Sequence, residues 1–177
     1  MTDLDTLAAR VTALEDIEAI KQLKSRYFRA CDAKDVATMR DCFAAGEVEI
    51  EYGRVGSFRH RDQLCEVFQN LAVHEHIIEM HHGQNPEVEL LTSDSAKGVW
   101  GLYYFLVNPR DQTLTQLGAS YFDEFKKIDG RWQITRTECV VQSTLLIDTS
   151  EGLAKVLFAG RQAPATIDDP TQQAADE

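Results

Sequence analysis

The sequence has no long apolar run, no basic segment and no cysteine pair with the spacing of a metal or redox motif. No stretch approaches the roughly 18 consecutive apolar residues that a membrane-spanning helix requires. The formal charge of −11 at pH 7 repels phosphate backbones and anionic lipid, and no Lys/Arg-rich run interrupts the acidic surface. We therefore expect neither nucleic acid nor a membrane as a partner.

The four cysteines lack C-x-x-C spacing, and they are Cys31, Cys42, Cys65 and Cys139. A chain of this size does not need disulfides, so we expect reduced and mostly buried thiols. The first ten residues, MTDLDTLAAR, are acidic where a signal peptide would be basic. The expected location is therefore the cytoplasm.

Several sequence motifs of nucleotide and hydrolase chemistry are also missing. There is no internal repeat, no G-x-G-x-x-G, no P-loop and no G-x-S-x-G elbow. With 177 residues and 44% hydrophobic content, the chain suits one well-packed core. We expect a single domain over residues 1–160 and a polar, mobile tail over residues 161–177.

Helical periodicity dominates the first part of the chain. Apolar residues at steps of three and four predict a long helix from Leu7 to about Cys31, which could break near residues 12–15. A second helix follows, and either Asp32 or Asp35 could cap its amino terminus. The remaining elements expected here are a short strand over residues 47–55 and a helix over residues 60–72.

Alternating apolar and polar residues dominate the second part of the chain. This pattern predicts strands over residues 77–91, 96–108, 113–127 and 131–147, separated by short turn sequences. Such strands form an antiparallel meander, and Thr149 or Ser150 could cap a short closing helix. The expected fold class is α+β, with helices laid across a curved, mainly antiparallel sheet and one cone-shaped pocket between them.

Several segments carry a family resemblance from about residue 14 to residue 146. RYFRACDAKDVATMRDCFA, MHHGQNPEVEL, AKGVWGLYYFL and YFDEFKKIDGRWQI resemble the SnoaL-like branch of the nuclear-transport-factor-2-like superfamily. DIEAIKQLKSRYFRACD, MHHGQNP and KKIDGRW are similar to the bile acid 7α-dehydratases and, more distantly, to scytalone dehydratase. The resemblance implies a cone-shaped α+β barrel, trimeric assembly and a cofactor-free lyase that removes water from a ring beside a carbonyl.

The resemblance also implies roles for three matched residues. Tyr27 falls on the dehydratase tyrosine, Asp32 on the aspartate that closes the first helix, and His81 on the general base. Because histidine ordinarily has a pKa of about 6.5, a neutral imidazole is well suited to take a proton from carbon. One position departs from the family: Tyr104 stands where the dehydratases have a carboxylate that orients the histidine, so Asp32 would have to supply that charge.

Strand alternation predicts which side chains line the wall of the pocket. Trp100, Leu102 and Tyr104 share one face of their strand, and Tyr121 is a weaker candidate for the same wall. These large side chains suit a hydrophobic ring substrate, although the core of a sheet would use the same residues. Glu138 is a further weak candidate.

The clustered histidines could also indicate a metal site. His74, His76, His81 and His82 lie within nine residues of each other but do not match the H-E-x-x-H spacing of a helical zinc site. Alternation also sends His81 and His82 to opposite faces of their strand, so only His81 is expected in the pocket. We therefore expect neither a metal nor another cofactor.

The expected function is a dehydratase that acts on a hydrophobic hydroxylated ring compound such as a steroid or a polyketide. His81 would be the base, Tyr27 a donor and Asp32 an orienting group. A ketosteroid-type isomerase, a polyketide cyclase and a non-catalytic ligand-binding or accessory subunit are the alternatives. The protein is expected to be a homo-oligomer, with a trimer favoured over a dimer.

Overall fold

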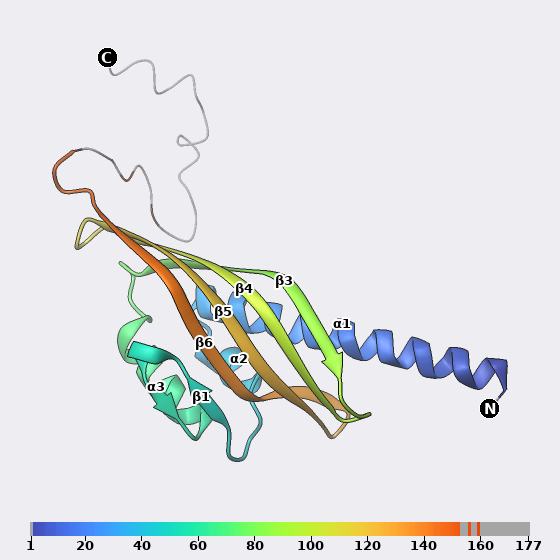
Figure 1. Ribbon diagram of the computed structural model, residues 1–177. Helices are drawn as coiled ribbons and strands as arrows, with labels where there is room; N and C mark the ends of the chain where they lie inside the picture. Colours follow the sequence, from blue (N-terminus) through green and yellow to red (C-terminus); the bar gives the residue numbers. More distant parts are fainter. Residues whose placement is uncertain (1, 153–155, 157–158, 160–177) are drawn as a thin grey trace, which may run out of the picture.

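Among the described residues, three α-helices precede four long strands in the sequence. Figure 1 shows how these elements are arranged. The computed structural model describes residues 2–152, 156 and 159. The helices are α1 (Asp3–Ala33), α2 (Val36–Asp41) and α3 (Arg61–Leu71). Within the described part of the chain, no helix combines the length and the apolar character needed to cross a lipid bilayer.

Helix α1 is continuous, so the break considered near residues 12–15 does not occur. It begins with a capping box in which Thr2 and Asp5 each accept a hydrogen bond from the other's backbone N–H. The residue after its last turn, Lys34, is the carboxy-terminal cap and adopts a left-handed conformation with φ of 60°. Asp35 then caps α2 by accepting a hydrogen bond from the Thr38 backbone N–H at 3.0 Å.

In the part of the chain that the structure describes, the strands form one open six-stranded sheet in the order β2-β1-β6-β5-β4-β3. The short strands are β1 (Glu49–Glu51) and β2 (Ser57–Phe58), and the long ones are β3 (Ile78–Leu90), β4 (Ser95–Asn108), β5 (Thr113–Ile128) and β6 (Arg131–Asp148). All neighbouring pairs are antiparallel except the parallel pair of β1 and β6. The predicted α+β class and the antiparallel meander are confirmed, and the sheet does not close into a complete barrel.

The strand expected over residues 47–55 is shorter than predicted. It covers only Glu49–Glu51, and a 3-10 turn over Gly53–Val55 follows it. Gly53 and Gly56 have positive φ values of 54° and 132°, which bend the chain back into β2. The predicted closing helix after Thr149 and the tail over residues 161–177 fall largely outside the described residues, so both stay predictions.

The sheet curves around the helices, with the carboxy-terminal half of α1 against its concave face (Figure 1). A register shift between Gln84 and Glu87 bends β3, and two further shifts bend the β5–β6 pair. The core between the layers includes Ile20, Phe43, Phe125 and Ile134. The amino-terminal half of α1 extends beyond the sheet (Figure 1).

Candidate active site

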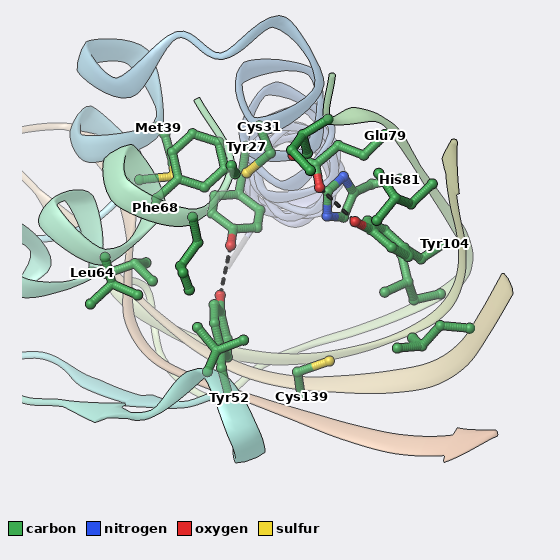
Figure 2. A pocket seen from close by; sticks show the side chains of 18 of the residues that line it. Tyr27, Cys31, Met39, Tyr52, Leu64, Phe68, Glu79, His81, Tyr104 and Cys139 are labelled. Atoms are coloured by element: carbon green, nitrogen blue, oxygen red, sulfur yellow. Dashed lines mark hydrogen bonds between the residues drawn. The ribbon is translucent and has the colours of Figure 1, made fainter. Parts of the chain in front are cut away.

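A cavity of about 350 Å³ lies between the helices and the concave face of the sheet. Its walls are mainly apolar, with side chains from all three helices and from β3 to β6 (Figure 2). Polar side chains enter it from α1, from the turn after β1, and from β3 and β4: Tyr27, Tyr52, Glu79, His81 and Tyr104. A mainly apolar pocket with a few convergent polar groups is typical of small-molecule sites.

His81 is held by Asp32, which lies near the end of α1. The imidazole Nδ1 lies 2.6 Å from Asp32 Oδ1, and the His81 backbone N–H donates to both oxygens of the same carboxylate, at 3.0 and 3.2 Å. Because a carboxylate only accepts, the neutral imidazole carries its proton on Nδ1 and has a lone pair on Nε2. Among the hydrogen bonds of the described residues, none involves Nε2, which is the ring atom left for a ligand.

Two aromatic rings fix the plane of the His81 ring. The Phe28 ring stacks on it with a centroid distance of 5.8 Å and an interplanar angle of 13°. The Tyr104 ring meets it edge-on at 4.9 Å. The carboxylate and the two rings therefore leave the imidazole little rotational freedom, as a positioned base requires.

A pair of phenols faces His81 across the cavity (Figure 2). The hydroxyls of Tyr27 and Tyr52 are 2.8 Å apart, and either one could be the donor. Burial raises the pKa of both phenols, so both keep their protons at neutral pH. Since one proton bridges the two oxygens, the other remains available to donate to a ligand.

A second polar chain lies next to His81. Tyr104 donates its hydroxyl proton to Glu79 Oε2 at 2.7 Å, and the other oxygen of Glu79 pairs with the ammonium of Lys34. The Lys34 and Glu79 side chains are only 8% and 7% exposed. Burial and the charge of Glu79 raise the pKa of the Tyr104 phenol, which therefore remains protonated.

An ion pair is buried behind the cavity wall. Lys24 Nζ lies 2.7 Å from Asp123 Oδ2, and both side chains are completely inaccessible to solvent. The ammonium lies 3.7 Å from the centroid of the Tyr121 ring, whose side chain lines the cavity. Burial lowers the pKa of Lys24, and the charge of Asp123 opposes that shift.

The structure brings most of the expected site residues together. Tyr27, His81, Leu102, Tyr104 and Tyr121 all line the cavity. Asp32 contacts the site through His81 and does not cap α2, since Asp35 performs that function.

Two expected wall residues lie elsewhere. Trp100 shares the concave face with Leu102, but it is not a lining residue: it is buried in the core, where its ring lies 5.8 Å from that of Phe125. Alternation predicts which face of a strand a side chain occupies, but it does not predict how far the cavity extends along that face. The prediction for Trp100 was therefore wrong, because this residue lies beyond the end of the cavity. Glu138 does not line the cavity either, and it pairs with Arg136 at 2.8 Å.

Sequence reasoning missed Tyr52, Glu79 and Lys34. Glu79 is two residues before His81, so alternation alone would have placed it on the same face. Tyr52 shares the spacing of Val48 and Ile50, which are both buried. Lys34 gave no local signal, because its partner is 45 residues away along the chain.

The histidines considered as metal ligands do not gather in one place. The rings of His74 and His76 stack at 5.3 Å before β3 begins, and His82 lies on the convex face beside Tyr103. Within residues 2–152, 156 and 159, no group of three or more histidine, cysteine, aspartate or glutamate side chains is arranged to hold a metal ion.

The fold and site define an α+β cone whose pocket contains a carboxylate-held histidine and two phenols that retain their protons. Residues 12–138 match the family model of the SnoaL-like domain. The chain therefore belongs to the SnoaL-like domain family, as the sequence resemblance predicted.

Solved structures share this fold. A scytalone dehydratase-like protein from Novosphingobium aromaticivorans aligns with a TM-score of 0.71 and 19% identity, over 88% of this chain and 99% of that one. A type 3 hexachlorocyclohexane dehydrochlorinase from Novosphingobium barchaimii aligns with a TM-score of 0.68 and 18% identity, over 88% and 99%. An NTF2-like protein with a cystatin-like fold from Novosphingobium aromaticivorans aligns with a TM-score of 0.69 and 20% identity, over 81% and 92%. At these identities the comparisons establish the fold alone.

Proposed function

We propose that the protein is a cofactor-independent lyase that eliminates water from a hydrophobic hydroxylated ring compound, such as a steroid or a polyketide. The observation that carries the proposal is the Asp32–His81 pair in a mainly apolar cavity. The names of two structural neighbours, a scytalone dehydratase-like protein and a dehydrochlorinase, also refer to eliminations. Bile acid 7α-dehydratase activity is one specific form of the proposal.

The proposed base is His81. Its Nε2 lone pair would take the proton from the carbon next to a substrate carbonyl, while Asp32 stabilises the imidazolium that forms. The C–O bond at the next carbon breaks as the C=C bond forms, and the electron pair leaves with the oxygen. The departing hydroxide receives a proton from the imidazolium and leaves as water, so that His81 returns to its starting state.

The charges around His81 support this direction of proton transfer. Asp32 and Glu79 together carry two negative charges, and Lys34 carries one positive charge. The cluster therefore has a net charge of about −1 while the imidazole is neutral, and it approaches neutrality when His81 is protonated. Asp32 and Glu79 thus offer the charge compensation that the family carboxylate would supply at the position of Tyr104.

The Tyr27–Tyr52 pair is the proposed electrophilic partner. One of its two protons remains free to donate to the substrate carbonyl as that oxygen becomes an enolate oxygen. A low-polarity wall around this donor strengthens the hydrogen bond.

A ketosteroid-type isomerase or a polyketide cyclase would use the same base and donor without water loss, and a ligand-binding accessory protein would use the cavity without turnover.

The test is turnover of a panel of hydroxylated 3-oxo-steroids and hydroxylated aromatic polyketides, followed by mass spectrometry. The wild type is expected to produce a species lighter by one water molecule, and His81→Ala to lose this activity. His82→Ala is the matched control, because that side chain lies on the opposite face of β3. Equal turnover by the wild type and His81→Ala would reject His81 as the base, and an isomeric product of unchanged mass would favour the isomerase.

A further inference from the structure

Glu79 and Tyr104 lie beside His81 (Figure 2), and Lys34 pairs with Glu79. None of these three side chains gives or takes a proton in the proposed reaction. Lys34 approaches from the end of α1 and holds one oxygen of Glu79, and its ammonium also lies 5.8 Å from the centroid of the Phe68 ring. Both charged side chains are almost completely buried. Such a buried pair holds its partners in one orientation, because either charge alone would be costly to bury.

The direction of the Tyr104–Glu79 hydrogen bond follows from this pairing. Glu79 is paired with the ammonium of Lys34 as a carboxylate, and a carboxylate has no proton to donate. Tyr104 must therefore be the donor in the 2.7 Å contact. With its only proton directed at Glu79, the phenol oxygen can offer a ligand nothing but its lone pairs.

The cavity thus contains two phenolic groups of opposite hydrogen-bonding character. The Tyr27–Tyr52 pair retains one proton to donate, whereas Tyr104 only accepts. The hydrogen bond to a carboxylate also polarises the Tyr104 oxygen and makes it a better acceptor. A ligand group beside Tyr104 must supply an O–H or N–H, since an acceptor there would leave both oxygens unsatisfied in an apolar cavity.

We propose that Tyr104, oriented by Glu79 and Lys34, is a specificity-determining residue that selects a substrate with a hydroxyl donor beside His81. A hydroxyl that donates to Tyr104 gains electron density on its oxygen and becomes a poorer leaving group. It is therefore retained, and the oxygen that leaves is a different one. Because this hydroxyl belongs to the substrate of the proposed lyase, the recognition role rests on the proposed function and defines its substrate as having at least two oxygen functions besides the carbonyl.

Equilibrium binding of two probes of similar shape tests this role. 2-Naphthol presents a donor, and naphthalene-2-carbaldehyde presents only an acceptor. The wild type is expected to bind the naphthol about tenfold more tightly than the aldehyde in calorimetric titration, as one satisfied hydrogen bond in a dry site provides. Tyr104→Phe should reduce this ratio to about twofold or less, because the acceptor is removed.

Glu79→Gln provides a sharper test, since it should reverse the preference. Lys34 would retain the amide oxygen of the new side chain, so the amide nitrogen would face Tyr104 and donate to it. The Tyr104 proton would then rotate toward the cavity, and the aldehyde would bind more tightly than the naphthol. Tyr103→Phe is the matched control, because this phenol lies on the convex face of the same strand and is 39% exposed.

Three results would overturn the role of Tyr104. They are equal affinities of the wild type for the two probes, no binding of 2-naphthol by the wild type, or a ratio of the two affinities in Tyr104→Phe that equals the wild-type ratio. Thermal unfolding monitored by circular dichroism would verify that each variant is folded, and Tyr104→Phe tests the role even if Glu79→Gln does not fold. Neither probe carries an acidic carbon–hydrogen bond beside a carbonyl, so their binding is independent of turnover. A hydroxyl preference without His81-dependent turnover would reject the lyase and retain the selectivity of the cavity.

Discussion

Asp32 holds His81 by both its side chain and its backbone, across 49 residues of sequence. The carboxylate accepts from Nδ1 at 2.6 Å and from the backbone N–H, so one side chain sets both the tautomer of the imidazole and the position of β3 relative to α1. An orienting carboxylate of this kind also stabilises the imidazolium. The pair is therefore the structural basis of the proposed base.

Asp32→Asn should reduce turnover by roughly 10²- to 10⁴-fold, because the amide can favour the wrong tautomer and cannot neutralise an imidazolium. The measurement is kcat on the substrate identified in the panel. Asp35→Asn is the matched control: it changes the same residue type three positions away, and asparagine caps a helix as well as aspartate does. A kcat for Asp32→Asn close to that of Asp35→Asn would contradict the orienting role.

The buried pair of Lys24 and Asp123 predicts a large effect on stability. Lys24→Met leaves the Asp123 carboxylate buried without its counter-ion, so the free energy of unfolding should fall by about 3–5 kcal/mol. Adding Asp123→Leu should recover most of that loss, because the second charge is then removed as well. Urea denaturation of both variants provides the comparison, and a double variant less stable than the single one would contradict this explanation.

The order of the elements was predictable because each long segment has one dominant period. The ends of the four long strands were predicted to within one residue, because each alternating pattern is long and is bounded by turn residues. The short strand β1 was overestimated, because alternation continues through Tyr52 while the glycines at 53 and 56 already bend the chain.

The site was predictable in part. The face occupied by His81, Leu102 and Tyr104 follows from alternation, but the extent of the cavity along β4 does not, which is why Trp100 was misplaced. The role of Asp32 could not be decided locally, since capping and a contact with His81 fit the same position. Only the path of the chain, which places β3 beside the end of α1, distinguishes the two.

Asp16 predicts a pH dependence of stability. Although burial opposes it, hydrogen bonds from Lys127 at 2.6 Å and from Trp132 at 2.9 Å hold the pKa of Asp16 below its ordinary value. A folded-state pKa below the unfolded one stabilises the fold above the unfolded pKa, and this contribution disappears as the pH falls through the folded pKa.

The test compares Asp16→Asn with the wild type in urea denaturation at several pH values. Asp16→Asn should be less stable than the wild type at pH values near 7, and the difference should narrow below the ordinary aspartate pKa of about 3.9. A difference that stayed constant from neutral to strongly acidic pH would show that the carboxylate charge is not the cause. Asp129→Asn is the control, because this side chain lies in the exposed turn between β5 and β6 and makes no hydrogen bond or ion pair among the described residues.

The convex face of the sheet predicts self-association. It exposes apolar side chains on four neighbouring strands, namely Met80, Val99, Tyr103, Phe122, Val140 and Leu145. The helices lie against the opposite face (Figure 1), so they do not cover these residues. Exposed apolar side chains gathered on one face of a sheet are often buried in an interface. We therefore expect a homo-oligomer, and the family resemblance favours a trimer.

Sedimentation velocity over a range of protein concentrations measures this assembly. Val140→Glu should shift the protein toward the monomer, because a carboxylate on the convex face would be buried without a partner in the interface. Leu4→Glu is the control, since Leu4 is 77% exposed on the projecting part of α1 and lies away from the sheet. A wild-type protein that remained monomeric at every concentration would contradict the prediction, and dissociation caused by Leu4→Glu alone would place the interface on α1.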